Sequence, residues 1–336
     1  MPWETFALNL QKAKTERVAC QWNCRAGILV SVSKGAHTGG ASKRFVKATP
    51  QSRMNYLQPI DYQTPEFGEL YDELPLWSAH FGLSMLQHVE MRPGMSILDV
   101  GAGTGFLSIE LAQRCGPDSR VIAVDPWTHA TARLRRKIQQ LGLTNIEVRD
   151  QDITAVDLPD NSIDLIVSNL GINNFDNPLA ALNTCFRLAK PGASLFLTTN
   201  LQGHLAEFYD AYRDTLIELG HHSCLEHLDR HIQHRATIPS VTSQLEAAGF
   251  IVYRAYESTF HERFVDGTAL LNHHFIRLAF MQDWRSVAPA GQEQATFTAL
   301  ERRLKSVAQA QGELSLTVPA ACIHARKPGS LMEISS

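Results

Sequence analysis

Hydrophobic and polar positions follow two different periods along the middle of the chain. Short apolar runs, typical of buried strands, alternate with stretches that carry apolar residues at helical spacing. The predicted strands are Ser96–Val100, Arg120–Val124, Asn145–Val148, Ile163–Ser168 and Ser194–Thr199. The helices predicted between them are Gly105–Gln113, Ala130–Leu141 and Pro178–Leu188. This alternation predicts parallel βαβ units and a doubly wound α/β sheet.

Further elements flank this region on both sides. Two helices, Pro65–Leu74 and Leu76–Val89, are predicted before the first strand. The segments predicted after the fifth strand are the helices Leu205–Gly220, Cys224–Gln233, Ser240–Ala248, Thr268–Trp284 and Ala295–Ala310, and the strands Ile251–Tyr256 and Leu314–Ala325. We expect these additions to cover the open face of the sheet and to shape a substrate pocket. The basic residues of the helix 130–141 are expected to form its solvated face: Arg133, Arg136 and Lys137.

Charge separates the first 53 residues from the rest. They hold nine basic and two acidic residues, a net of +7, so that a chain of net charge −3 carries −10 elsewhere. Three interpretations stay open: a disordered basic tail, an organelle transit peptide, or a non-native extension before a true start at Met54. The acidic remainder argues against a nucleic-acid partner, and the absence of a long apolar run argues against a membrane. Six scattered cysteines indicate reduced thiols and a cytoplasmic protein.

A glycine-rich segment follows the first predicted strand. Asp99, Gly101, Gly103 and Gly105 form the pattern D-x-G-x-G-x-G, with Ala102 between the first two glycines. Glycines let a ligand approach the backbone closely, and the following helix offers free N–H groups to an anion. A dinucleotide fingerprint would place its third glycine one position later, where Phe106 stands. The spacing therefore favours S-adenosylmethionine (SAM) over NAD.

Polar residues follow the next three strands in the same way. Asp125, before Pro126, can accept hydrogen bonds from both ribose hydroxyls, a feature shared by NAD proteins. Asp152 can accept from the adenine amine, and the backbone N–H of Ile153 can donate to a ring nitrogen. Asn169 follows the fourth strand. Four loops in order thus indicate an adenosine-containing ligand.

With these motifs, the stretch from about Glu73 to Asn200 resembles class I SAM-dependent methyltransferases. It is most similar to the small-molecule type that includes ubiquinone and menaquinone biosynthesis enzymes. The resemblance implies SAM as methyl donor and a Rossmann-like, seven-stranded, mostly parallel sheet with an antiparallel last strand. The cofactor-binding residues that it implies run from the methionine end to the floor near the sulfonium: Asp99, Gly101, Ala102, Gly103, Gly105, Asp125, Pro126, Asp152, Ile153, Asn169 and Leu170.

The predicted organisation has four parts. They are the extension 1–53, N-terminal helices over the cofactor site at 54–92, the SAM-binding core 93–202, and a completing segment with helical caps at 203–336. The cap contains a long insertion, Asp266–Gly312, that the short quinone-type enzymes lack. The quinone substrate therefore stays open, as do the methylated atom and the oligomeric state.

Candidates for the acceptor side are less constrained. Tyr71 and Trp77 either close over SAM or pack in the core, and Asn173 and Asn174 lie where the methyl group should project. The candidates for a general base are three histidines: His80, His273 and His274. The cluster His221–His234 lacks the accompanying ligands of a metal site, so no metal is predicted.

Three functions stay in play. We expect a SAM-dependent methyltransferase that acts on a small-molecule acceptor by in-line displacement. A non-catalytic SAM-binding or partner-binding module with the same fold is the alternative. A nicotinamide oxidoreductase is disfavoured by the glycine spacing. Arsenite methylation requires converging thiols, whereas Cys115 and Cys185 fall in predicted core helices.

Overall fold

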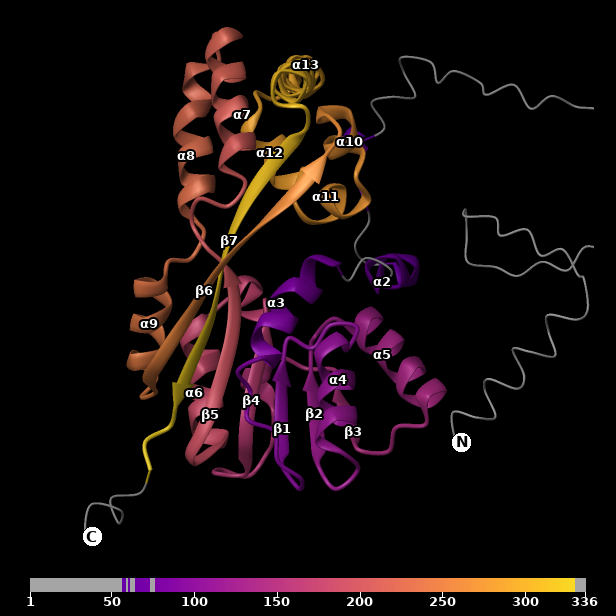
Figure 1. Ribbon diagram of the computed structural model, residues 1–336, viewed down its shortest axis with the longest axis vertical. Coiled ribbons are helices and arrows are strands. Elements are labelled where there is room, and N and C mark those ends of the chain that lie inside the picture. The colour runs from indigo at the N-terminus through magenta and orange to yellow at the C-terminus, as the bar shows by residue number, and fades with distance from the viewer. Residues whose placement is uncertain (1–55, 59, 61–63, 73–75, 330–336) are drawn as a thin grey trace, which may run out of the picture. The chain divides into compact units, whose positions relative to one another are not determined.

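The structure is a computed structural model that describes residues 56–58, 60, 64–72 and 76–329 (Figure 1). The predictions made for the extension 1–53 and for Met54 lie outside the described residues. Residues from Ala48 onward belong to one unit of the chain.

Seven strands form one sheet in the order β3-β2-β1-β4-β5-β7-β6 (Figure 1). They are β1 (Ser96–Val100), β2 (Arg120–Val124), β3 (Ile146–Arg149), β4 (Ile163–Asn169), β5 (Ala189–Asn200), β6 (Ile251–Phe264) and β7 (Leu314–Arg326). The first five strands pair in parallel, and β7 is antiparallel to both of its neighbours, β5 and β6. This confirms the predicted mostly parallel sheet with an antiparallel last strand. The strand order reverses between β1 and β4, which is where ligands bind in such sheets.

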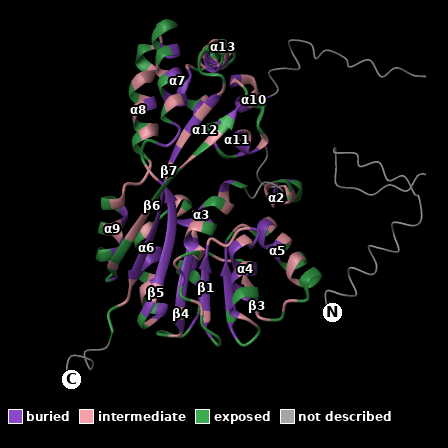
Figure 2. Ribbon diagram, viewed as in Figure 1, coloured by how far each residue is buried: buried purple, intermediate pink, exposed green. Residues whose placement is uncertain are grey.

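Helices cover both faces of the sheet, and the central strands β1, β2, β4 and β5 are mostly buried (Figure 2). On one face, α3, α4 and α5 pack against Ile97, Val167 and Ala123. On the other face, α6 and α9 pack against Leu98 and Val100. The helices of these two layers are α3 (Leu76–Leu86), α4 (Phe106–Cys115), α5 (Thr128–Leu141), α6 (Pro178–Leu188) and α9 (Ile238–Ala247). Alternate side chains of each strand thus feed opposite cores, as the pleat requires.

The last two strands extend well beyond the rest of the sheet. Pairing between β5 and β7 ends at Asn200 opposite Ala320, whereas β6 and β7 stay paired as far as Phe264 and Leu314. The predicted strand 251–256 was therefore too short. Its continuation, ESTFHERF, is dominated by polar residues because β6 is the edge strand of the sheet and exposes much of its length.

A helical cap packs on the extension of β6 and β7 (Figure 1). Its helices are α7 (Ala206–Glu218), α8 (Leu225–Gln233), α10 (Gly267–Asn272), α11 (His274–Ala279), α12 (Met281–Val287) and α13 (Glu293–Gln311). The single helix predicted over 268–284 is wrong, because the backbone leaves the helical region at His273 (ψ 128°) and again at Phe280 (φ −131°). Within the described ranges, no helix is long and apolar enough to cross a membrane.

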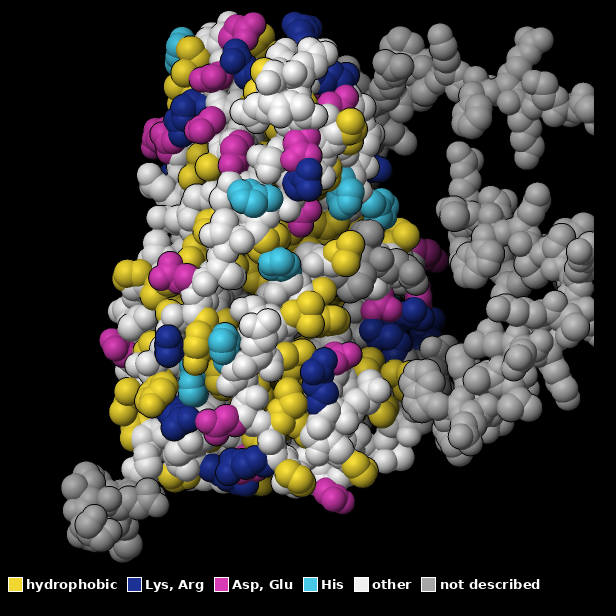
Figure 3. Space-filling view, in the orientation of Figure 1, with side chains coloured by type: hydrophobic (Ala, Val, Ile, Leu, Met, Phe, Trp, Pro, Cys, Tyr) yellow, Lys and Arg dark blue, Asp and Glu magenta, His cyan; other side chains and the backbone are white. Residues whose placement is uncertain are grey.

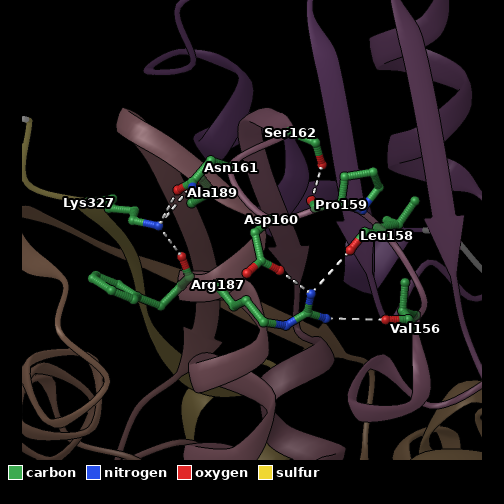
Figure 4. Close-up of polar contacts among 10 residues, drawn as sticks. Val156, Leu158, Pro159, Asp160, Asn161, Ser162, Arg187, Ala189 and Lys327 are labelled. Carbon is green, nitrogen blue, oxygen red and sulfur yellow. Dashed lines mark hydrogen bonds and ion pairs between the residues drawn. The ribbon is translucent and has the colours of Figure 1, made fainter.

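Two cations, Arg187 and Lys327, bind backbone oxygens near the amino ends of the parallel strands (Figure 4). Arg187, in the last turn of α6, donates to the carbonyl oxygens of Leu158 (3.1 Å) and Val156 (3.3 Å). Lys327, just beyond β7, donates to the carbonyl oxygens of Phe186 (2.8 Å) and Ala189 (2.9 Å). The Phe186 carbonyl belongs to the last turn of α6, where a cation is favourable.

Candidate cofactor site

A cavity of about 310 Å³ opens at the carboxyl ends of β1 and β4. Five of the predicted cofactor residues line it: Asp99, Gly101, Ala102, Gly103 and Asn169. Tyr71, predicted as an acceptor-side or core residue, lines it as well. The lining residues that sequence reasoning missed are Asp72, Ser78, Thr104, Phe106, Leu107 and Lys137. The first and the last of these come from helices that the motif pattern does not reach.

The glycine loop is tied to the end of β2. The N–H groups of Gly101 and Ala102 donate to the carbonyl oxygen of Val124 at 2.9 and 3.2 Å. Gly105 caps α4 with φ +83°, and a Cβ at that position would lie 2.0 Å from a methyl carbon of Leu134. No residue other than glycine fits there, since both the backbone conformation and the space exclude a side chain. The loop therefore holds one fixed conformation beside the cavity.

Asp99 fixes the start of α4. Its carboxylate accepts a hydrogen bond of 2.5 Å from the Ser108 hydroxyl. Burial raises the pKa of Asp99 to about 7, against the opposing effect of the Ser108 hydrogen bond. The first N–H groups of a helix have no partner within it, and those of Phe106 and Leu107 belong to residues that line the cavity. This helix end can bind an anionic group of a ligand.

Asp125 links the second strand to the glycine loop. Its Oδ2 accepts from the Gly103 N–H and its Oδ1 from the Trp127 N–H, both at 2.8 Å. Burial raises the pKa of this carboxyl group, and the two backbone hydrogen bonds oppose the shift. Each carboxylate oxygen keeps a further lone pair for a ligand hydroxyl. Asp125 thus positions the loop and still has capacity to bind.

The adenine-side residues lie outside the lining of the cavity. Asp152 is exposed and accepts from the Thr154 N–H at 2.8 Å, which caps a short 3-10 helix. Ile153 buries its side chain in the core between the sheet, α6 and α9. Asp125, Pro126, Gly105 and Leu170 also lie outside the lining. Their roles in cofactor binding stay predictions.

Asn169 joins α3 to the sheet at the end of β4. Its Nδ2 donates to the Ser78 carbonyl oxygen at 3.0 Å, and its Oδ1 accepts from the Thr198 hydroxyl at 2.8 Å. Leu170 follows with φ +64°, a conformation that L residues rarely adopt, and donates its N–H to the same Thr198 hydroxyl at 3.1 Å. The floor of the cavity is thereby fixed by hydrogen bonds from three elements.

The helix α2 (Pro65–Asp72) is held beside the cavity by charge. Asp72 accepts from Arg133 at 2.8 Å and from Lys137 at 2.5 Å, both on α5. Glu69 pairs with Arg133 at 3.2 Å and also with Arg136. The face of α5 that we expected to be solvated is therefore a docking face for α2, and only Arg136 is more than half exposed. Opposite charges on two helices were present in the sequence, but no local pattern pairs them.

The candidate acceptor residues separate into different environments. Trp77 is 8% exposed and stacks on Phe275 with ring centroids 5.3 Å apart. Asn173 donates to the Asn200 side chain at 3.0 Å, and Asn174 is exposed. Trp77 is thus held under the cap and Asn173 at the end of β5, while Asn174 contributes to the surface.

The candidate histidines do not line the cavity. His80 is exposed and its ring lies 3.9 Å from that of Phe260, and His273 is exposed beside Phe264. His274 is half-buried. Histidines occur at several separate places on the face shown in Figure 3. Among the residues that the structure describes, no group of three or more His, Cys, Asp or Glu side chains is placed to hold a metal ion.

Comparison with known proteins agrees with this geometry. The sequence profile of a family described as "Methyltransferase domain" matches residues 91–249. A ubiquinone/menaquinone biosynthesis C-methyltransferase of Hydrogenovibrio crunogenus is 30% identical over 141 residues, 41% of this chain and 54% of that relative. An arsenite methyltransferase of Halobacterium salinarum is 29% identical over 112 residues, 33% of this chain and 29% of that relative. The chain thus spans about half, or less, of the curated relatives it matches.

A crystal structure of a candidate methyltransferase from Bacillus halodurans has the same fold. It superposes with a TM-score of 0.50 at 18% identity, covering 74% of this chain and 98% of the other. Residues 91–249 belong to the SAM-dependent methyltransferases. The resemblance inferred from the motifs is thereby confirmed, and SAM is the cofactor of this family.

The cavity of this methyltransferase domain fits such a cofactor. Its volume of about 310 Å³ is within the range of small-molecule sites, about 300–1,000 Å³. It presents the start of α4 to a carboxylate, and the carboxylates of Asp99 and Asp72 to an ammonium group. Gly101 leaves no room for a side chain, since a Cβ there would lie 3.0 Å from the Gly171 Cα. The donors and acceptors at this end match the amino-acid part of SAM.

Proposed function

We propose that this chain is a SAM-dependent methyltransferase that transfers a methyl group to a small-molecule acceptor. The observation that carries the proposal is the cavity at the switch point of the sheet, lined by Asp99 and the glycine loop within a methyltransferase domain. SAM supplies an electrophilic methyl group when it is bound. The residues of the chain hold and orient the reactants, because alignment is the main requirement of an in-line displacement.

Each predicted cofactor residue has a place in the proposal. The start of α4 and the loop Gly101, Ala102, Gly103, Gly105 hold the methionine part, beside Asp99. Asp125, followed by Pro126, binds the ribose, and its hydrogen bond to Gly103 couples the two parts. The adenine contacts assigned to Asp152 and Ile153 are the part with least structural support, because Asp152 is engaged in a local cap. Asn169 and Leu170 form the boundary with the acceptor.

The remaining predictions for the protein belong to the same proposal. The acceptor is a small molecule and not a nucleic acid or a membrane, since the chain beyond residue 53 carries net negative charge. A cytoplasmic location is supported by four free thiols among the described cysteines: Cys115, Cys185, Cys224 and Cys322. The core 93–202 and the completing segment 203–336 divide cofactor binding from acceptor binding. Arsenite methylation is not proposed, because three of those thiols are buried.

Calorimetric titration of the full-length protein with SAM, S-adenosylhomocysteine and NAD tests the proposal. We expect both adenosyl ligands to bind and NAD not to bind. Production of S-adenosylhomocysteine from SAM with a panel of hydroxylated and amino acceptors then tests catalysis. Binding of NAD in place of SAM would overturn the assignment, and SAM binding without turnover on any acceptor would favour a non-catalytic module.

A variant of Asp125 locates the binding site. Asp125→Ala should weaken SAM binding by roughly 2 kcal/mol, about thirty-fold, because hydrogen bonds to a charged group contribute about that much. Asp118→Ala is the matched control, since Asp118 is an exposed carboxylate in the turn before β2. Equal affinities of the two variants would place SAM away from Asp125 and the glycine loop that it holds.

A further inference from the structure

His204 is a buried histidine whose ring nitrogens have no protein partner. It lies in the loop between β5 and α7 and is 2% exposed. Its ring lies 5.6 Å from that of Trp77 and 5.3 Å from that of Phe280, between centroids. Neither Nδ1 nor Nε2 has a hydrogen-bond partner within the described residues. Buried polar atoms in native proteins are paired in about 90% of cases or more, so this ring calls for a partner that the chain does not supply.

Two further buried nitrogens near this loop lack partners in the same described part of the chain. They are Nδ2 of Asn200, at the end of β5, and Nε of Arg235, between α8 and α9. The two loops are joined, because the Gln202 N–H donates to the Ala236 carbonyl oxygen at 3.0 Å. The guanidinium carbon of Arg235 lies 5.9 Å from the Phe280 ring centroid. Two adjacent segments thus carry buried N–H groups without acceptors in the described chain, and that of Arg235 lies beside the Phe280 ring.

Four rings, Trp77, Phe260, Phe275 and Phe280, form what we call the aromatic cluster. Trp77 is at its centre, with ring centroids 5.8, 5.3 and 5.6 Å from the other three. Flat apolar walls of this kind bind planar rings. The positive charge of Arg235 beside the cluster opposes a cationic ligand and favours a neutral or anionic one.

The aromatic cluster adjoins the cofactor cavity. Trp77 is followed directly by Ser78, which lines the cavity and accepts the hydrogen bond from Asn169. Leu170, at the boundary proposed above, packs on the same apolar core as Trp77 and Leu205. Trp77, whose ring lies beside that of His204, thus joins the aromatic cluster to Ser78 in the lining of the cavity, and we place the methyl acceptor on this side.

We infer that His204 binds the methyl acceptor and removes the proton from its hydroxyl group, with the acceptor's ring on the aromatic cluster. The inference rests on the proposed function. The acceptor is a small, planar, neutral or anionic ring that carries a hydroxyl group, because unpaired N–H donors require an oxygen and the cluster requires a ring. Asn200 and Arg235 donate hydrogen bonds to the acceptor's oxygen atoms. Entry of the ring requires the segment that carries Phe275 and Phe280 to move, since His204 is covered.

The proposed step balances as follows. The acceptor oxygen forms a bond to the methyl carbon, and the carbon–sulfur bond breaks with its electron pair staying on sulfur. The hydroxyl proton moves to a ring nitrogen of His204 and later leaves to solvent. Burial, with the nearby charges of Arg235 and His231, holds the pKa of His204 well below its usual range. The imidazole is therefore neutral before the transfer, so that one of its ring nitrogens carries no proton.

Phenol binding to the full-length protein saturated with S-adenosylhomocysteine tests the inference, with benzene as the probe that lacks the hydroxyl. We expect phenol to bind, and His204→Phe to weaken it about ten-fold, the value of one or two lost hydrogen bonds. Benzene binding and the affinity for S-adenosylhomocysteine should stay unchanged. His324→Phe is the matched control, because His324 is also buried but has a partner, Ser194 Oγ, at 3.0 Å.

Several outcomes would overturn the inference. They are absence of phenol binding to the wild type, equal losses for phenol and benzene, and an equal effect of His324→Phe. If His204→Phe does not fold, His204→Gln replaces it: a retained phenol affinity with lost methyl transfer to phenols supports the proton-accepting role, and unchanged transfer rejects it. Failure of S-adenosylhomocysteine to bind the wild type would instead refute the proposed function, which makes the two failures distinguishable.

Discussion

The cofactor side and the acceptor side of the proposed site differ in how their buried polar groups are satisfied. On the cofactor side, Asp99, Asp125 and Asn169 all have hydrogen-bond partners within the protein. On the acceptor side, His204 and Asn200 keep buried nitrogens without partners in the described chain. The first side is therefore formed before any ligand arrives, whereas the second side awaits a group from the ligand. A fixed donor site can be shared by many enzymes, and specificity then depends on the unsatisfied half.

The largest effect that we expect comes from a substitution on the cofactor side, at Gly105. Gly105→Ala combines a left-handed backbone with a Cβ 2.0 Å from a Leu134 methyl carbon. The free energy of unfolding should fall by about 3 to 5 kcal/mol, from overpacking and backbone strain together. Gly142→Ala is the control, because Gly142 has φ +65° and open space around it, and should lose only about 1 to 2 kcal/mol. Similar losses in denaturant melts would show that the Gly105–Leu134 contact can relax.

The next effect concerns Asp99, the buried carboxyl group of the cofactor side. Folded Asp99 has a pKa of about 7, against 3.8 for an ordinary aspartate, so the native state holds a proton that the unfolded state has lost. The stability that this group contributes is complete below about pH 4 and is lost as the pH rises to about 7. The difference in unfolding free energy between wild type and Asp99→Asn should change by on the order of 4 kcal/mol across that window.

Denaturant melts of both proteins at several pH values measure this difference. Stability of the wild type relative to Asp99→Asn should fall with rising pH, and Asp118→Asn, an exposed site, should show no such trend. Parallel stability curves for wild type and Asp99→Asn would mean that Asp99 is ionised in the native protein throughout.

The same contrast explains how much the sequence could predict. The glycine loop, Asp125 and the parallel strands follow from local spacing, because short-range geometry alone determines where those groups lie. The length of β6 was hidden by polar residues on an edge strand, and the breaks at His273 and Phe280 interrupt a continuous apolar pattern. His204 follows the fifth strand, so extending the rule for carboxyl ends of strands by one loop would have found it. Its burial depends on cap residues distant in sequence, which no local pattern reveals.

The smallest effect that we expect concerns the ion pairs between α2 and α5 on the cofactor side. The local sequence pattern did not predict these pairs either. Arg133 pairs with Asp72 and Glu69 at 2.8 and 3.2 Å and does not line the cavity. Arg133→Met keeps the apolar stem but removes these partners, and Lys137 still holds Asp72. We expect SAM affinity to fall by about 0.5 to 1 kcal/mol at low salt, the usual value of a partly exposed ion pair.

Salt separates this docking role from a packing role. High salt should weaken SAM binding to the wild type and remove most of its advantage over Arg133→Met, because ions screen the α2–α5 pairs. Arg114→Met is the control, since Arg114 pairs with Glu110 at 2.8 Å on the exposed side of α4. If Arg133→Met binds SAM as the wild type does at every salt concentration, the charges between α2 and α5 do not hold α2 over the cofactor. The glycine loop and the sheet would then be sufficient to hold the cofactor residues in place, and α2 would be available to contact the acceptor.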